Sequence, residues 1–529
     1  MFSNSGRPLT RRGLHLASRA LAAALLLGAT AVSGLAPAAA QSHNVLRMAR
    51  NAEPGLFVPW LIDDNTALFT LGNVYDGLLR VTKDGAGVEP ALATSWDTSP
   101  DGLTWTFHLR PGVMFSDGTP LTSNDVKVSL DVARGATGKR SVWKDNYKAI
   151  QDIQTPDAST VQITLGQPHA PILSELAMFP AWIMQADKAT ATEQPGYDDA
   201  QNWASKGTGG YYTESWKKGD PVILKRNPYY WKDTPAIDEV DIEYIPDDNT
   251  RVLKLQGGED DVIDFVPFSQ IDALNSSPGI QAQDFPIQQT TFGMLNVTKA
   301  PLDDVRVRQA LNYATDKDAI IKSVYFGQAQ PMNAPIPNGT YVDKDSPGYP
   351  YDLTKAQSLL AQSSVPNGFN LPLLVANNNQ DRINTAIILK DEWSKIGVNV
   401  DIQQVENSVW REARTSGNYT ATLSAWTNDM NDPTEIVNYE MRGGEGSDSR
   451  AYWTNYNNPD LSAKITAADL EQDPTKREAD YIDIQRTFLN DAPLVFMANL
   501  GATAAWRSNV HGFFIDGLSY YRFEDVTLQ

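Results

Sequence analysis

Alternation of apolar and polar residues predicts strands in the first half of the chain. In residues 103–110, Leu, Trp, Phe and Leu alternate with Thr, Thr, His and Arg after an Asp-Gly turn, so this segment is expected to be a half-buried strand. Residues 44–48 are expected to form another strand. Residues 68–79 have helical spacing of apolar positions, and a further helix is expected from Val126, with Ser123, Asn124 or Asp125 as its N-cap.

A strand, a helix and a second strand are predicted between residues 371 and 402. Residues 371–375 and 398–402 fit strands, and the apolar residues from Ile383 to Ile396 lie on one side of a helix that ends at Gly397. This order implies parallel pairing, and hence a mixed α/β domain. Residues 303–322 form a helical region in two parts, the second capped by Thr315 or Asp316.

Residues 419–426 alternate as one more strand, and a polar segment follows it directly. Ligands in open α/β sheets bind outside the carboxyl ends of strands. The segment that begins Trp426-Thr427-Asn428-Asp429 is therefore a candidate ligand contact.

Charge and length restrict the class of protein. The 529 residues include 44 basic and 64 acidic side chains, a net charge of −20. Clustered cations grip nucleic acid and anionic membranes, so neither is expected as a partner. The length exceeds the roughly 250–300 residues at which one core stops growing, which predicts two or three domains.

The first 40 residues have the pattern of a secretory signal peptide. Residues 1–19 are basic, residues 20–35 are small and apolar, and Ala38-Ala39-Ala40 forms a cleavage motif. Arg11-Arg12 suggests the twin-arginine route as an alternative to general secretion. No later run of 18 apolar residues occurs and there is no cysteine to lipidate, so we expect a soluble periplasmic protein without a membrane anchor.

Sequence signals for cofactors and catalysis are missing. The chain has no cysteine, and its five histidines stand at unrelated spacings, so neither a metal nor another cofactor is expected. The stretch Gly135-Ala136-Thr137-Gly138-Lys139 fails as a phosphate loop, because Ala133 and Arg140 replace the first glycine and the metal-binding hydroxyl. A nucleophile elbow is also missing. The 13 tryptophans favour a protein that binds an organic ligand, since aromatic rings bury a large area at little entropic cost. With 64 acids, a secreted carbohydrate-active hydrolase is the competing hypothesis.

Four blocks of sequence form a series along the chain. They are Val74-Tyr75-Asp76-Gly77-Leu78-Leu79 with residues 92–96 and 101–122; Gly207-Thr208-Gly209-Gly210-Tyr211 with Arg226-Asn227-Pro228-Tyr229-Tyr230-Trp231; residues 303–317; and residues 426–433. Together they resemble one known family, the extracellular solute-binding proteins of the oligopeptide, dipeptide and nickel type that serve ABC importers. The blocks run in family order over about residues 74–433.

The resemblance implies an α/β clamp of two lobes and three domains with mixed sheets. One discontinuous domain would span residues 41–75, 206–290 and 496–529, and a smaller domain, 76–205, would be inserted in it. Residues 291–495 would form the second lobe. Chain crossings near 285–292 and 492–498 would form the hinge, and the closed form would dock on a membrane permease.

The resemblance also suggests how a ligand is held. Asp429 stands where peptide-binding relatives place an aspartate against the ligand's α-amino group, and Trp426 would supply an apolar wall. Asp432 is assigned to capping the helix after Pro433. Glu53 resembles a further position that faces the amine, although a solvated turn residue would look the same.

The residue that would bind a ligand carboxylate is not identified by the resemblance. Leu423 and Ala376 stand at or near positions where relatives carry arginines, which leaves Arg382 and Arg414 as substitutes. We therefore expect a monomeric, non-catalytic receptor for a di- or oligopeptide. A sugar, an opine-like conjugate, glutathione or a metal chelate stays open as the ligand.

Overall fold

The computed structural model describes residues 44–62, 65–138, 140–194, 196–197, 206–337, 339–443 and 453–529. The predicted signal peptide lies outside the described residues. Within these ranges, no helix is both long enough and apolar enough to cross a lipid bilayer.

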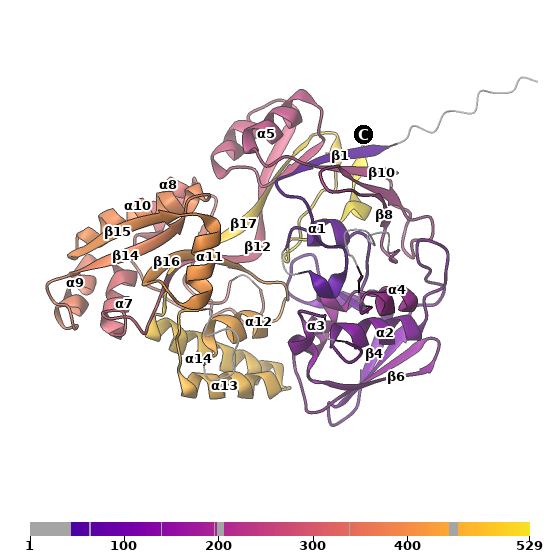
Figure 1. Ribbon diagram of the computed structural model, residues 1–529, viewed down its shortest axis with the longest axis horizontal. Coiled ribbons are helices and arrows are strands. Elements are labelled where there is room, and N and C mark those ends of the chain that lie inside the picture. Colours follow the sequence, from indigo (N-terminus) through magenta and orange to yellow (C-terminus); the bar gives the residue numbers. More distant parts are fainter. Residues whose placement is uncertain are drawn as a thin grey trace, which may run out of the picture. The chain divides into compact units, whose positions relative to one another are not determined.

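One eleven-stranded mixed sheet connects the described chain from end to end (Figure 1). Its order is β15 (Val398–Val405), β14 (Phe369–Ala376), β16 (Ala421–Thr427), β12 (Ile280–Leu295), β17 (Leu494–Arg507), β11 (Val262–Asp264), β1 (Val45–Arg50), β10 (Glu239–Tyr244), β9 (Val222–Arg226) and β8 (Tyr211–Ser215), with β13 (Gln330–Pro331) also paired to β17.

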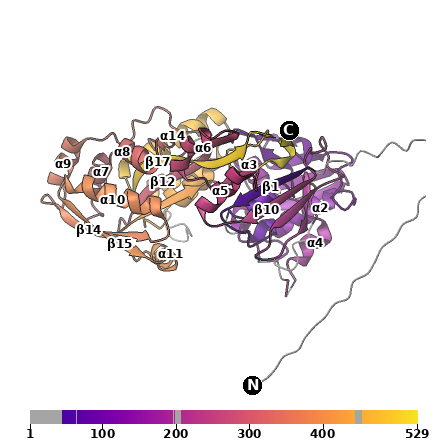
Figure 2. The same cartoon turned by 90° about the horizontal axis from the view of Figure 1, so that it is seen from above.

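The two long strands at the centre of the sheet, β12 and β17, join its two halves. They pair antiparallel from Ile280 opposite Arg507 to Met294 opposite Leu494, and the register shifts between Pro286 and Gln289. β12 also pairs with β16, whereas β17 also pairs with β11. The remaining strands of each half therefore lie on opposite sides of this pair, as Figure 2 shows for β14 and β1.

Each half contains the parallel pairing that a ligand-binding α/β sheet needs. β14 is parallel to β15 and to β16, and α10 (Gln380–Ser394) connects β14 to β15, which confirms the predicted strand–helix–strand unit. In the other half, β1 is parallel to β10 and β11. The carboxyl ends of these strands carry the loops that form the candidate site.

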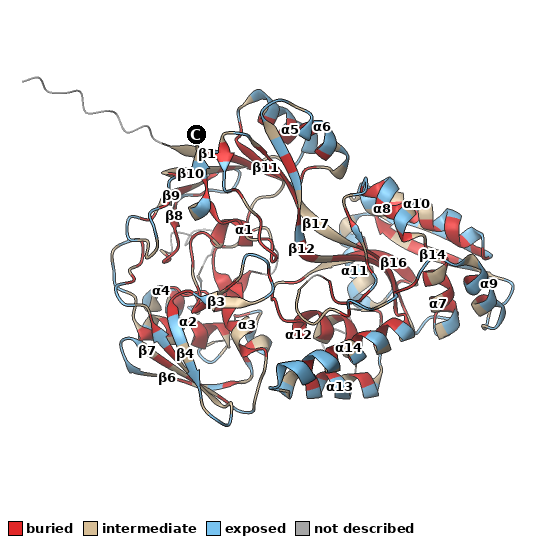
Figure 3. Ribbon diagram, turned by 180° about the vertical axis from the view of Figure 1, so that it is seen from behind, coloured by how far each residue is buried: buried red, intermediate tan, exposed pale blue. Residues whose placement is uncertain are grey.

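The half that contains β14 to β16 is covered by helices on both faces. One core packs Leu295 and Val495 against α7 (Val305–Tyr313), α8 (Lys317–Val324), α9 (Leu353–Ala361) and α10. Another packs Phe292 and Phe496 against α12 (Thr434–Ile436), a π-turn (Val437–Met441), α13 (Pro459–Leu470) and α14 (Pro474–Asp491). Figure 3 shows these strands as buried, and shows exposed outer faces on α9 and α13.

The half that contains β1 is built on a larger core. After β1, the chain of this half forms a 3-10 helix (Pro59–Leu61), α1 (Leu68–Leu71) and the hairpin of β2 (Leu79–Val81) and β3 (Val88–Pro90) before it enters the smaller sheet. The smaller sheet has the order β4 (Ala93–Thr98), β5 (Thr104–Leu109), β7 (Thr160–Leu165) and β6 (Ile150–Asp157). In the chain, α2 (Ser123–Ala133) lies between β5 and β6, and α3 (Ile172–Ala177) and α4 (Ala186–Ala191) come after β7. All three helices contribute residues to the same core as the sheet. On the opposite face of the main sheet, α5 (Asp248–Gly257) and α6 (Ile271–Asn275) pack on Ala282 and Ala505. The chain ends in the short pair β18 (Val510–His511) and β19 (Thr527–Leu528).

Two local predictions are wrong. The helix expected over residues 68–79 ends after one turn, because Asn73 is held outside a helical ladder: its Nδ2 donates to Phe69 O (3.2 Å) and its Oδ1 accepts from the distant Phe523 amide (2.9 Å). The N-cap of α2 is Thr122, whose amide donates to Asp125 (2.9 Å), while Ser123 Oγ donates to Asp157 O instead. The strands predicted near residues 44–48 and 103–110 are confirmed.

Candidate functional site

The candidate site begins where β16 ends, at the polar segment singled out in the sequence. Gln289 Nε2 donates to Thr427 Oγ1 (2.7 Å). Asn428 is buried, donates through Nδ2 to Gln288 Oε1 (2.9 Å) and accepts at Oδ1 from Trp426 Nε1 (2.8 Å). Thr427 and Asn428 therefore hold the segment against the central strand β12.

A buried ion pair fixes the far end of this segment. Both nitrogens Nη1 and Nη2 of Arg477, on α14, donate to the Asp432 carboxylate (2.6 and 2.8 Å). Asp432 Oδ1 also accepts from the Thr434 amide (2.9 Å), but the N-cap of α12 is Pro433, so Asp432 lies one residue before the capping position predicted for it. Although burial raises the pKa of Asp432, the Arg477 charge and these hydrogen bonds lower it overall, so the carboxylate is ionised.

Between these two anchors lie Asp429 and Glu435. One oxygen of Glu435, Oε2, accepts from the backbone amides of Asp429 (2.9 Å) and Met430 (2.8 Å). Desolvation raises the pKa of Asp429 to about 7, and desolvation together with the Asp429 charge raises the pKa of Glu435 well above its usual range. Neither pKa is lowered by a cation of the described chain, so the two acids form a desolvated acidic pair.

Residues from the half that contains β1 meet this acidic pair. The side chain of Asn65 hydrogen-bonds Asp429 and lowers its pKa in part. Tyr520 lies close enough for the charges of Asp429 and Glu435 to raise its pKa further, after desolvation. Met430 packs into the core of the same half. The acids therefore lie where the two halves of the sheet face each other.

The two arginines predicted to bind a ligand carboxylate both contact one tryptophan. The guanidinium carbons of Arg382 and Arg414 lie 5.0 and 4.6 Å from the centre of the Trp410 ring, which α11 (Asn407–Ser416) carries. Arg414 Nη1 also donates to Ser424 Oγ (3.3 Å). Ser424 and Trp426 alternate with Ala425 on β16, so they point to the same face of the sheet.

Cationic and acidic groups thus follow one another along the end of a single strand. The arginine cluster contacts β16 at Ser424, and the acidic pair lies just after its last residue, Thr427. Between them, the Trp426 ring lies 5.0 Å from the Tyr439 ring and forms an aromatic surface. Such a strip suits an extended zwitterion, because it offers opposite charges at its two ends.

Glu53, the weaker candidate for the amine, contacts other residues. Its carboxylate accepts from the Gly219 amide (2.7 Å), and its charge is one cause that raises the pKa of Tyr244 after desolvation. Both Glu53 and Tyr244 follow or end parallel strands, β1 and β10. Its part in ligand binding stays a prediction.

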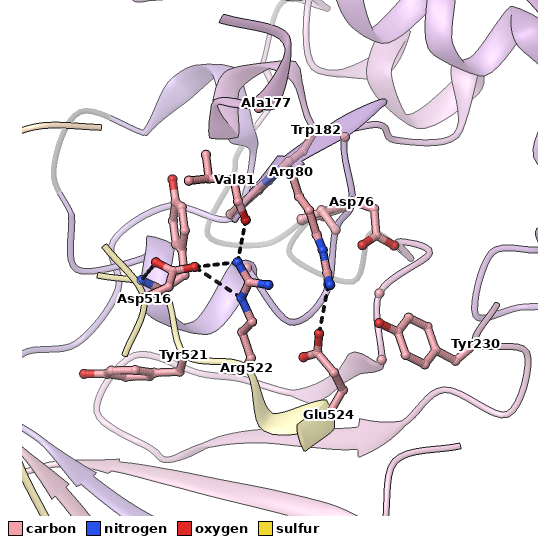
Figure 4. A pocket seen from close by; sticks show the side chains of 16 residues that line it. Asp76, Arg80, Val81, Ala177, Trp182, Tyr230, Asp516, Tyr521, Arg522 and Glu524 are labelled. Atoms are coloured by element: carbon pink, nitrogen blue, oxygen red, sulfur yellow. Dashed lines mark hydrogen bonds and ion pairs between the residues drawn. The ribbon is translucent and has the colours of Figure 1, made fainter. Parts of the chain in front are cut away.

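A small pocket of about 50 Å³ lies beside Tyr520 in the half that contains β1 (Figure 4). Arg522 Nη2 donates to Asp516 (2.9 Å) and to Val81 O (2.6 Å), and Arg80 Nη1 donates to Glu524 (3.4 Å). Both arginines are paired inside the protein, and these pairs hold the C-terminal segment that carries Tyr520 against β2.

Further contacts join the two halves around the acidic pair. The Ala170 amide donates to Asp469 O (3.1 Å), Gln288 Nε2 donates to Gly85 O (3.2 Å), and Thr340 Oγ1 donates to Ala86 O (3.1 Å). The Gln288 bond is buried, whereas the Thr340 bond is exposed, and both would have to break if the two halves separate as a clamp opens. In the described ranges, no group of three or more His, Asp or Glu side chains is placed to hold a metal ion.

The model of the bacterial extracellular solute-binding proteins, family 5 (Middle), matches residues 87–448 of this sequence. The chain belongs to this family. This membership confirms the resemblance found in the sequence. The solved structures that are similar to this chain confirm the clamp of two lobes.

Relatives of this family 5 protein match it over about nine tenths of its length. It is 28% identical over 489 residues to the probable D,D-dipeptide-binding periplasmic protein DdpA of Escherichia coli, covering 90% of this chain and 92% of the relative. It is 29% identical over 514 residues to heme-binding protein A of Haemophilus influenzae, covering 93% of each. Among solved structures, the periplasmic binding protein DppA of Helicobacter pylori in complex with the peptide STSA matches with a TM-score of 0.80 at 29% identity, over 92% of this chain and 98% of that one.

Several residues of the site were not found by sequence reasoning. Glu435, Asn65, Trp410 and Tyr520 come from four separate segments and fit no motif. For Glu435 the sequence points the other way, because glutamate is rarely buried and nothing next to it marks it as an exception.

Proposed function

We propose that this family 5 protein is a periplasmic receptor that binds a small zwitterion, a di- or oligopeptide, and delivers it to an ABC import permease. The observation that carries the proposal is the strip at the end of β16, with Arg382 and Arg414 on one side and Asp429 with Glu435 on the other. In a peptide, the ammonium would meet Asp429 and the carboxylate would meet the arginines.

The ligand acts by closing the clamp. One lobe comprises residues 41–75, 206–290 and 496–529 with the inserted domain 76–205, and the other comprises residues 291–495. The hinge lies where β12 and β17 pass from one lobe to the other, near residues 285–292 and 492–498. A ligand that touches Asp429 on one lobe and the surroundings of Tyr520 on the other favours the closed state by its difference in affinity for the two states. The receptor is a monomer and leaves its ligand chemically unchanged.

Calorimetry with three forms of one peptide tests the proposed function. The free peptide should bind at one site per chain, whereas the N-acetylated form and the C-amidated form should each bind about ten- to a hundredfold more weakly, because each lacks one charge-assisted hydrogen bond. Recovery of the peptide intact after incubation distinguishes a receptor from a hydrolase. Equal affinity for all three forms, or no binding of any peptide library, would contradict the proposal. Mass spectrometry of the solute that co-purifies from periplasm identifies the native ligand.

Binding should depend on pH through Asp429. Its pKa of about 7 in the desolvated surroundings of this structure means that the carboxyl is mostly protonated below pH 7, and this proton must leave when a ligand ammonium binds. Affinity should therefore rise as the pH is raised from 5 to about 7, by up to about tenfold per pH unit for each proton released, and level off above it. Calorimetry at pH 6 in two buffers of different ionisation enthalpy measures the proton release directly. No release would show that the carboxyl is already ionised before binding.

A further inference from the structure

In the proposed function, Asp429 alone binds the ligand ammonium, and Glu435 is left without a ligand contact. It is only 3% exposed, and while Oε2 accepts two backbone amides, its other oxygen, Oε1, has no hydrogen-bond partner in the described part of the chain. Buried carboxylate oxygens are normally paired, so an unpaired one in a binding site indicates a partner that arrives with the ligand. The hydroxyl of Tyr520, which lies near the same acids, also lacks a partner among the described residues.

Charge balance indicates what that partner is. Asp429 and Glu435 interact directly through their charges, and no lysine or arginine of the described ranges compensates either of them. If both acids are ionised, two negative charges lie buried side by side. One ligand ammonium balances one of them, and the other must then hold a proton or meet a second cation.

We propose that Glu435 is a second cation-binding carboxylate and that the site selects ligands with two positive charges close together. The fitting class is a peptide whose first residue carries both its α-ammonium and a side-chain ammonium or guanidinium, such as lysine, ornithine or arginine. This inference rests on the proposed function, which places the ligand amine at Asp429. Arginine offers planar paired donors and lysine a compact charge, so either can reach Glu435 Oε1 while its methylene groups lie along aromatic surface.

The surroundings of the pair suit such a side chain. Trp182 lies with its ring centre 5.8 Å from that of Tyr520, and Tyr75 lies 6.3 Å from Trp182. These rings come from the lobe opposite Glu435, so a long basic side chain would touch both lobes and add to the force that closes them. A short or acidic first residue would leave Glu435 unpaired in the closed state.

Two dipeptides that differ only in charge test the proposal: Lys-Ala, and norleucine-Ala, in which a methyl group replaces the side-chain ammonium. The wild-type protein should bind Lys-Ala at least about tenfold more tightly at pH 7.5. Glu435→Gln should remove this preference while it still binds norleucine-Ala, because the glutamine Oε1 can accept the same two backbone amides. Glu440→Gln is the matched control: Glu440 is equally buried and both of its oxygens lack partners in the described residues, but its pKa is not affected by Asp429 or Glu435, so the preference should persist.

The outcomes separate this inference from the proposed function. Equal binding of both dipeptides by the wild-type protein would overturn the role of Glu435 and leave the receptor intact, and so would a preference that survives Glu435→Gln. Binding of neither dipeptide, nor of any peptide, would overturn both. If Glu435→Gln does not fold, the wild-type comparison still decides, together with proton release: Lys-Ala should displace more protons than norleucine-Ala at pH 6.

Discussion

Replacing Arg477 with methionine should lower the free energy of unfolding by about 3–5 kcal/mol. The substitution leaves the Asp432 carboxylate buried without its partner, and removing one member of a buried ion pair costs about this much. Arg477 also donates to Thr434 Oγ1 (2.9 Å) and to Ala468 O (3.1 Å), so it joins the segment of the acidic pair to α13 and α14. Urea titration followed by tryptophan fluorescence measures the change.

The control for Arg477 is a cation on the neighbouring helix. Lys464 on α13 pairs with Asp483 on α14, but both side chains are about half exposed, so Lys464→Met should change stability by about 1 kcal/mol or less. If Arg477→Met were equally mild, the pair would not hold the segment. A double change of Asp432 and Arg477 to apolar residues should recover part of the loss, because no buried charge is then left over.

Asp429→Asn should weaken the binding of a free-amine peptide by about ten- to a hundredfold. An amide in place of the carboxylate removes a charge-assisted hydrogen bond that contributes about 1.5–3 kcal/mol. The side chain keeps its size, so the packing against Asn65 and Tyr520 is preserved. The pH dependence of binding between pH 5 and 7 should decrease in the same variant, because the group whose pKa lies near 7 is gone.

The N-acetylated peptide is the control ligand for this variant. It has no ammonium to lose, so wild type and Asp429→Asn should bind it with affinities within about threefold of each other. Losses of the same size for both ligands would mean that Asp429 shapes the loop rather than binds the amine. A stronger effect on the C-amidated peptide would place the ligand in the opposite orientation along β16.

Local sequence patterns determined much of the fold, because they depend on near neighbours. The alternation of apolar and polar residues in 103–110 predicted a strand. The strand, helix and strand patterns between residues 371 and 402 predicted two parallel strands joined by a helix. The same logic put a polar segment at the carboxyl end of β16, where Asp429 lies. Burial on one face of an element leaves a periodic pattern of apolar residues that a single sequence shows.

Only the tertiary structure decided which charges meet. The helix that begins at Leu68 ends before Asn73, whose side chain binds the Phe523 amide. Phe523 is 450 residues away in sequence, so no local pattern could predict this contact. Arg382 and Arg414 gather on Trp410, and Glu435 faces Asp429 beside Tyr520, from segments with no common spacing. The pKa of each acid is set by desolvation and by charges brought near through folding, and these depend on distance in space rather than on distance along the chain.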